Sequence, residues 1–332
     1  MIKLMMGAAL AALTTGCATV PTQATLAAEP KMPTATEISV PGPEGALAGT
    51  LLSPAAADAP LVLIVPGSGP TDRDGNNPLG VAAASYRLLA EALATRGIAS
   101  ARIDKRGMFA SKGAIADANA ATIGGYADDV AAWARMLTAR TGRDCIWVAG
   151  HSEGGLVALA AAADRNVCGL ILIASPGRTI DVVIREQLAA NPANAPLLAD
   201  ANAALDRLAR GERVDVADMH PALAQGLFNP AVQGFLIDMM ARDPAAMIAA
   251  TAKPVLIVSG AKDLQVARAN ADALKAAQPR AELVVIDGMN HVLKQVAGDD
   301  RAANMASYAD PALPIDPTLV AQIARFVAAG AD

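Results

Sequence analysis

The chain has 332 residues, of which 53% are apolar and 18% are charged, and its net charge is −5. This length is sufficient for one large α/β domain, and so mild a charge gives no reason to expect a nucleic-acid partner. Three histidines and three cysteines without zinc-like spacing predict no metal site, and no cofactor is expected.

The N-terminus has the pattern of an export signal. Lys3 precedes an apolar run, residues 4–13, that is too short to span a bilayer. The run ends in Leu13-Thr14-Thr15-Gly16-Cys17, which resembles a bacterial lipobox, although the leucine stands four residues before the cysteine instead of three. Residues 1–17 are therefore predicted to be a signal peptide, with Cys17 as the lipidated residue. Ordinary cleavage near Ala24 or Ala28 is the alternative.

Residues 18–36, rich in Ala, Thr and Pro, are predicted to be a flexible tether. The folded domain is expected to occupy residues 37–332. We expect the protein to be exported, either free in the periplasm or anchored to the cell envelope by the lipid, which is the only membrane contact expected. The oligomeric state is not predicted.

An apolar strand is predicted over residues 61–65, and it runs into Pro66-Gly67-Ser68-Gly69-Pro70-Thr71-Asp72-Arg73-Asp74-Gly75-Asn76. Glycines at such a site let backbone N–H groups approach a substrate oxygen closely. Ser68 is therefore a candidate oxyanion-hole donor through its backbone N–H, together with the N–H of Glu153. Taken alone, the stretch could equally be a Gly/Pro turn leaving a strand.

The next predicted strand, residues 99–103, leads into Asp104-Lys105-Arg106-Gly107. A third, residues 145–149, precedes Gly150-His151-Ser152-Glu153-Gly154, and helix formers follow from residue 156. A serine between a buried strand and a helix, with glycines two before and two after it, is typical of a nucleophile on a tight turn. Ser152 is the predicted nucleophile.

Two later strands supply the partners that such a serine needs. Residues 254–260 form a predicted strand followed by Asp263, and residues 281–286 form another followed by His291. The C-terminal ends of parallel strands are where catalytic groups gather in open α/β sheets. His291 is the predicted base and Asp263 the acid that orients it.

The rival residues are weaker choices. His151 must leave the turn in another direction than Ser152, and His220 lies in a helix-rich stretch. Asp287 stands at the strand end itself, with little chain to swing back toward His291, and Asp181 follows the preceding strand, residues 169–174.

These motifs resemble the α/β-hydrolase fold, and in particular a bacterial esterase-like branch of serine hydrolases with P-G-S-G-P-T-D-R-D-G-N and D-K-R-G motifs, here at residues 66–76 and 104–107. The order Ser152, Asp263, His291 is the nucleophile–acid–base order of that fold. One departure is Gly107-Met108-Phe109-Ala110-Ser111, where the family usually has G-x-G-x-S.

The resemblance implies a mostly parallel central sheet flanked by helices, with a helix beginning near Tyr126 and a helical cap inserted after the sixth strand, over about residues 178–250. Seven apolar residues of that segment could line an acyl pocket or only pack the cap onto the body. They are Leu223, Leu227, Phe228, Phe235, Met239, Met240 and Met247.

The function expected from this resemblance is cleavage of a small carboxylic ester through an acyl-enzyme intermediate. A serine peptidase for short peptides is the enzymatic alternative, and it would need a cap carboxylate, such as Glu186 or Glu212, for a free amine. A non-catalytic envelope protein is the alternative of another class.

The same fold would make the strands that begin near Cys145 and Cys168 parallel neighbours. Neighbouring strands lie about 4.8 Å apart, within the Cα separation of disulfides. An oxidising compartment would preserve such a bond. A Cys145–Cys168 disulfide is therefore predicted, with two buried free thiols as the alternative.

Overall fold

The computed structural model of the protein describes residues 32–54, 56 and 58–330. The predicted signal peptide, Cys17 and most of the predicted tether lie outside the described residues. The prediction for the end of the tether was wrong, because strand β1 already begins at Thr34 (Thr34–Pro41). It pairs along its whole length with the antiparallel strand β2 (Ala46–Ser53). Among the described helices, none has the length and apolar character that crossing a bilayer requires.

The described strands form one eight-stranded sheet in the order β1-β2-β4-β3-β5-β6-β7-β8. Strand β2 is antiparallel to both of its neighbours, whereas β4, β3, β5, β6, β7 and β8 run parallel to one another. The parallel strands are β3 (Leu61–Val65), β4 (Ala99–Ile103), β5 (Ile146–His151), β6 (Val167–Ile173), β7 (Val255–Gly260) and β8 (Glu282–Ile286). The predicted fold class, a mostly parallel sheet flanked by helices, is confirmed.

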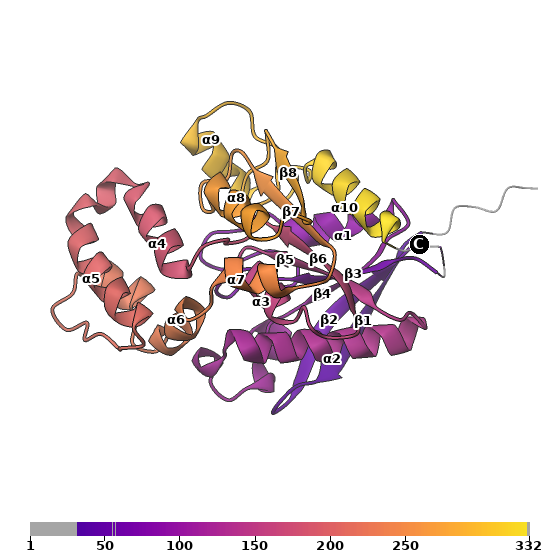
Figure 1. Ribbon diagram of the computed structural model, residues 1–332, viewed down its shortest axis with the longest axis horizontal. Helices are drawn as coiled ribbons and strands as arrows, with labels where there is room; N and C mark the ends of the chain where they lie inside the picture. Colours follow the sequence, from indigo (N-terminus) through magenta and orange to yellow (C-terminus); the bar gives the residue numbers. More distant parts are fainter. Residues whose placement is uncertain (1–31, 55, 57, 331–332) are drawn as a thin grey trace, which may run out of the picture. The chain divides into compact units, whose positions relative to one another are not determined.

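The central strands are buried on both faces, which explains their unbroken apolar sequences. In β3, Leu61, Leu63 and Val65 face one hydrophobic core, and Val62 and Ile64 face a second. Helices α2 (Ile123–Thr141), α3 (Glu153–Ala160) and α8 (Arg268–Ala277) cover the first face, and α1 (Ser85–Ala94) and α10 (Pro317–Ala329) cover the second. Figure 1 shows α1 and α10 above the sheet in this view and α2 below it.

A helical insertion joins β6 to β7, and we call it the cap. It contains α4 (Ile180–Ala189), α5 (Leu198–Ala209), α6 (Gln233–Met240), α7 (Pro244–Ala250) and the short helical turns Pro192–Leu197 and Leu223–Leu227. Its first helices, α4 and α5, project beyond the end of the sheet (Figure 1). The carboxylate of Asp238 in α6 accepts a hydrogen bond of 2.7 Å from the backbone N–H of Ile123, the first residue of α2. This contact ties the cap to the body at a helix N-terminus, where a negative charge is stabilising.

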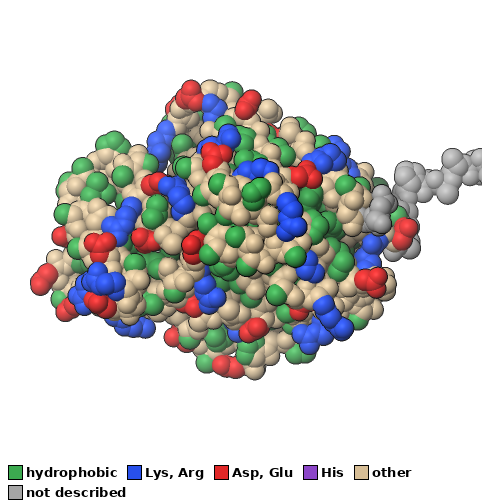
Figure 2. All heavy atoms as spheres, viewed as in Figure 1, with side chains coloured by type: hydrophobic (Ala, Val, Ile, Leu, Met, Phe, Trp, Pro, Cys, Tyr) green, Lys and Arg blue, Asp and Glu red, His purple; other side chains and the backbone are tan. Residues whose placement is uncertain are grey.

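The remaining described elements are short. They are α9 (Arg301–Ala306) and the 3₁₀ turns Phe109–Ala114, Ala118–Ala120 and Ser307–Ala309. On the face shown in Figure 2, acidic and basic side chains are interspersed, without a large patch of one sign.

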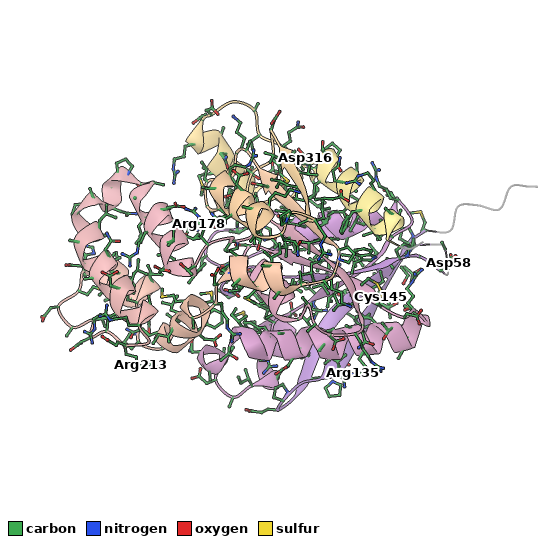
Figure 3. All side chains as sticks on the ribbon, viewed as in Figure 1. Asp58, Arg135, Cys145, Arg178, Arg213 and Asp316 are labelled. Carbon is green, nitrogen blue, oxygen red and sulfur yellow. A yellow bond between two sulfur atoms is a disulfide. The ribbon has the colours of Figure 1, made fainter. Side chains whose placement is uncertain are left out.

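A disulfide joins Cys145 to Cys168, with the Cα atoms 5.1 Å apart. Cys145 directly precedes β5, and Cys168 lies near the start of β6. The pairing shifts here from Ile146 opposite Val167 to Trp147 opposite Gly169, so Cys168 is an additional residue in β6. Figure 3 shows Cys145 at the end of the sheet away from the cap. The bond therefore links the N-terminal ends of two neighbouring strands.

Candidate active site

Ser152 occupies the sharp turn between β5 and α3. Its backbone has φ 53° and ψ −124°, a conformation that residues with a side chain rarely adopt. Two glycines make so tight a turn possible. A Cβ on Gly150 would lie 2.2 Å from the carbonyl oxygen of Gly154, and one on Gly154 would lie 2.3 Å from that of Val65. The strand–turn–helix arrangement presents the Ser152 hydroxyl at the C-terminal edge of the sheet.

His291 and Asp263 meet at the same edge. The Nδ1 atom of His291 lies 2.8 Å from Oδ2 of Asp263, and both side chains are buried. Because a carboxylate only accepts hydrogen bonds, Nδ1–H is the donor, and Nε2 of the neutral ring is left to accept a proton. The second carboxylate oxygen, Oδ1, accepts from the backbone N–H groups of Gln265 and Val266 at 2.7 and 2.9 Å. Asp263 is thus held in place by its own loop.

Ser152 and His291 line the same pocket. No hydrogen bond joins their side chains within the part of the chain that the structure describes. In free enzymes such a bond is often long and tightens only when substrate binds. The arrangement therefore brings together the predicted nucleophile, the predicted base and the acid predicted to orient it.

The rival residues lie elsewhere. Asp287 is exposed, and within the described residues no hydrogen bond or ion pair joins it to His291. Asp181, in α4, lies 3.8 Å from Arg185. His220 is exposed and accepts a hydrogen bond from the N–H of Ala222 within its own turn.

The predicted oxyanion-hole residues flank Ser152. A Cβ placed on Gly67 would lie 3.2 Å from the Cβ of Ser152, so the loop after β3 passes directly beside Ser152. Ser68 lines the same pocket as Ser152, and Glu153 is the first residue of α3. Within the described residues, the backbone N–H groups of Ser68 and Glu153 donate no hydrogen bond. Both are therefore available to an oxyanion formed at Ser152.

The pocket has a volume of about 130 Å³. It is lined by Gly67, Ser68, Thr71, Gly75, Asn77, Val81, Ser85, Tyr86, His151, Ser152, Gln265, His291, Val292 and Tyr308. The lining is part polar and part apolar and, among the described residues, contains no Asp, Glu, Lys or Arg. A site of this composition suits a small neutral substrate.

The seven apolar cap residues that could have lined an acyl pocket do not line this one. Four of them are buried in the hydrophobic core, and the other three pack against it. They hold the cap on the body, which is the second of the two interpretations that the sequence allowed. Periodicity could not decide between them, because a pocket wall and a core face have the same pattern.

His151 has a structural part in the site. It is buried, with Nε2 lying 2.9 Å from the backbone oxygen of His291 and Nδ1 lying 2.8 Å from the hydroxyl of Tyr86. Since a carbonyl oxygen only accepts, Nε2 carries the proton, and the Tyr86 hydroxyl donates to Nδ1. That hydroxyl in turn accepts a hydrogen bond of 3.0 Å from the N–H of Gly67. Burial, followed by the neighbouring His291 imidazole, lowers the pKa of His151 to about 3.

This chain of hydrogen bonds connects the loop after β3 to the loop that carries His291. Tyr86, which lies in α1, could not be predicted from the sequence as a site residue, because a buried position on a helix carries no local signal that its hydroxyl links two loops. Burial also raises the pKa of Tyr86 well above its usual range, so the hydroxyl stays protonated.

Charged residues of the segments 66–76 and 104–107 join these two loops to each other and to α2. Arg73 donates to Asp104 through Nε and a terminal nitrogen at 3.1 and 2.8 Å, and Arg106 binds both carboxylate oxygens of Asp129 at 2.7 and 2.6 Å. In the segment that departs from the family pattern, the N–H of Gly107 donates to the backbone oxygen of Ser111 at 3.0 Å. That turn closes locally without the missing glycine.

The mostly parallel sheet, the sharp turn that carries Ser152 and the hydrogen-bonded pair Asp263–His291 together define a hydrolase of the α/β-hydrolase fold. Residues 79–295, more than half of the chain, match the family described as serine aminopeptidase, S33. The chain belongs to this family. The matched segment contains Ser152, Asp263 and His291.

Known proteins agree with this assignment. Esterase EstD of Thermotoga maritima is 26% identical over 250 residues, which are 73% of this chain and 56% of that protein. The chain thus spans little more than half the length of this relative. An esterase of Pyrococcus furiosus has a TM-score of 0.57 at 15% identity, with 89% of this chain and 91% of that one covered. For a proline iminopeptidase of Mycobacterium smegmatis the TM-score is 0.58 at 17% identity, with 90% and 100% covered. At such identities the two structures share only the fold with this chain.

Proposed function

We propose that the protein is a serine hydrolase that cleaves small, neutral carboxylic esters through an acyl-enzyme intermediate. The observation that carries this proposal is the hydrogen bond between Asp263 and His291, together with the pocket that His291 shares with Ser152 on its strained turn. A protein that only binds a ligand has no need of this combination.

In the proposed reaction the Ser152 hydroxyl attacks the acyl carbon while Nε2 of His291 takes its proton. Asp263 holds the imidazole and stabilises its cationic form. The negative charge that develops on the carbonyl oxygen is met by the N–H groups of Ser68 and Glu153. His291 then gives its proton to the leaving alcohol, and a water molecule repeats the sequence on the acyl-enzyme.

Two observations support an ester over a peptide with a free amino terminus. A bound ammonium group would need a carboxylate, and the described lining of the pocket contains none. The cap carboxylates considered for this role are paired elsewhere. Glu186 binds Arg178 through both oxygens at 2.7 and 2.6 Å, close to where the cap leaves the body (Figure 3). Glu212 pairs with Arg207 and Arg210 on the exposed surface. The esterase named among the relatives points the same way.

Activity profiling tests the proposal. p-Nitrophenyl esters of increasing acyl length are compared with aminoacyl-p-nitroanilides, using the wild-type protein, Ser152→Ala and the control Ser39→Ala, which changes an exposed serine of β1. We expect hydrolysis of the short esters, loss of activity and of fluorophosphonate labelling in Ser152→Ala, and no effect of Ser39→Ala. Faster cleavage of the anilides would favour a peptidase, and a wild-type protein inert to every substrate and to the fluorophosphonate would favour the non-catalytic alternative.

We also propose that the protein is exported and that Cys17 is lipidated. The Cys145–Cys168 disulfide supports export, since such bonds persist in oxidising compartments. Mass spectrometry of the N-terminal peptide of protein made in its native host tests lipidation. A diacylglycerol-modified Cys17 is expected, and an unmodified N-terminus near residue 25 or 29 would show ordinary signal-peptide cleavage.

A further inference from the structure

The two donors of the proposed oxyanion hole come from separate segments of the chain. Ser68 lies in the loop after β3, and Glu153 begins the helix after β5. Their N–H groups must be held in a fixed relation, because a donor that points away from the oxyanion contributes nothing. One buried side chain contacts both segments, and it is Lys105 from the loop after β4.

The ammonium group of Lys105 bridges these segments. Its Nζ atom donates to the backbone oxygen of Gly67 at 2.7 Å and to Oε1 of Glu153 at 3.0 Å. The Lys105 side chain is 3% exposed and that of Glu153 is 1% exposed. The ring of Tyr126 lies beside the ammonium group, with its centroid 5.2 Å away.

The contact with Gly67 acts directly on a catalytic donor. The C=O of Gly67 and the N–H of Ser68 belong to the same peptide unit, and in a planar trans peptide these two groups point in opposite directions. Holding the Gly67 oxygen toward Lys105 therefore turns the Ser68 N–H away from Lys105. A cation at the oxygen also polarises the peptide and strengthens its N–H as a donor.

The buried pair is poorly explained by stability alone. Replacing a buried ion pair with apolar side chains is often neutral or stabilising, because both charges lose their hydration. Here the second oxygen of Glu153, Oε2, is buried without a hydrogen-bond partner among the described residues, which adds to the cost. A pair retained at this cost, between two catalytic segments, points to a role in function.

We propose that Lys105 is a positioning residue that orients the 67–68 peptide and fixes it relative to Glu153, so that both oxyanion donors converge beside Ser152. The inference rests on the proposed function. The proposed function and the role of Lys105 can be refuted separately. An active Ser152→Ala would refute the hydrolase mechanism, whereas the variants below test Lys105 alone.

The test compares two variants that differ only at Lys105. Glu153→Gln removes the charge of the partner but keeps Lys105 on the Gly67 oxygen, and it serves as the reference. Lys105→Met/Glu153→Gln also removes that contact and leaves no unpaired buried charge. Relative to the reference, we expect kcat for a p-nitrophenyl ester to fall about 10- to 100-fold while KM changes by less than about threefold. Binding of an arylboronic acid, whose tetrahedral adduct at a serine needs the oxyanion hole, should weaken by a similar factor.

Lys105→Arg in the Glu153→Gln background is the second variant, and it also covers the case in which the methionine variant does not fold. A guanidinium still donates to the Gly67 oxygen but with altered geometry, so kcat and boronate affinity should fall between those of the other two proteins. A purely structural lysine would give kcat and boronate affinity within about twofold of the reference in every variant that folds, with changes confined to the melting temperature. That outcome would overturn the proposal.

Discussion

Loss of the Cys145–Cys168 bond should lower the stability of the protein without lowering its activity. The bond closes a loop between residues 23 positions apart. In the chain-entropy model such a loop restricts the unfolded chain by about 11 cal/mol/K, which stabilises the folded state by about 3.4 kcal/mol at 25 °C. With about 300 ordered residues, the unfolding entropy is about 0.6 kcal/mol/K, so the melting temperature should fall by about 5 °C.

Activity should not follow this change. Cys145 precedes β5 and Ser152 follows it, so the disulfide and Ser152 lie at opposite ends of the same strand. Cys145→Ala/Cys168→Ala is expected to keep the wild-type kcat/KM at 25 °C, well below its melting temperature.

The assay is calorimetry of the wild-type protein with and without a phosphine reductant, with free thiols counted in parallel. The double variant is the control, since the reductant should leave its melting temperature unchanged. A fully reduced wild-type protein that melts at the temperature of the oxidised one would refute the loop-entropy reasoning. Two free thiols in protein isolated from an oxidising compartment would refute the bond itself.

Three further predictions concern the site. Asp263→Asn should lower kcat for esters by about 10⁴-fold, because only the acid that orients His291 fixes the imidazole tautomer. Asp287→Asn should leave kcat within about threefold of the wild-type value. Equal losses of kcat in steady-state assays of the two variants would contradict the assignment. Burial lowers the pKa of His151 from 6.5 to about 3, so as the pH falls its imidazole is protonated in the unfolded chain before it is protonated in the folded protein. The free energy of unfolding should therefore drop by about 1.4 kcal/mol per pH unit between pH 6.5 and about pH 3. In urea titrations His151→Gln should remove that part of the slope, and an unchanged slope would argue against a buried neutral imidazole. Gly154→Ala would place a Cβ 2.3 Å from a carbonyl oxygen of β3 and should destabilise the fold by about 3 kcal/mol. Gly113→Ala is the control, because a Cβ there enters open space. Similar melting temperatures for the two variants would show that the turn relaxes at little cost.

The tertiary structure changed the interpretation of two segments. Residues 34–36 look like the end of a tether because Thr, Ala and Pro surround them, yet they pair with β2 and extend the sheet. Phe228 and Met239 have the apolar character of a pocket wall, yet they pack in the core. In both cases the composition is shared by two environments, and only the neighbours across space distinguish them.

Sequence alone was sufficient for the individual strands and for the tight turn at Ser152, because their causes are local. An unbroken apolar run such as residues 61–65 reports a strand covered on both faces, and Gly150 and Gly154 report a turn that no larger residue fits. Ser152, Asp263 and His291 could be assigned because each of them follows the C-terminal end of a predicted strand. Tyr86 and Lys105 carried no such signal, because each acts through contacts with loops distant in sequence. Which loops meet around them depends on the strand order β4-β3-β5, and a non-local pairing of this kind is decided by packing of the whole sheet and not by any one segment.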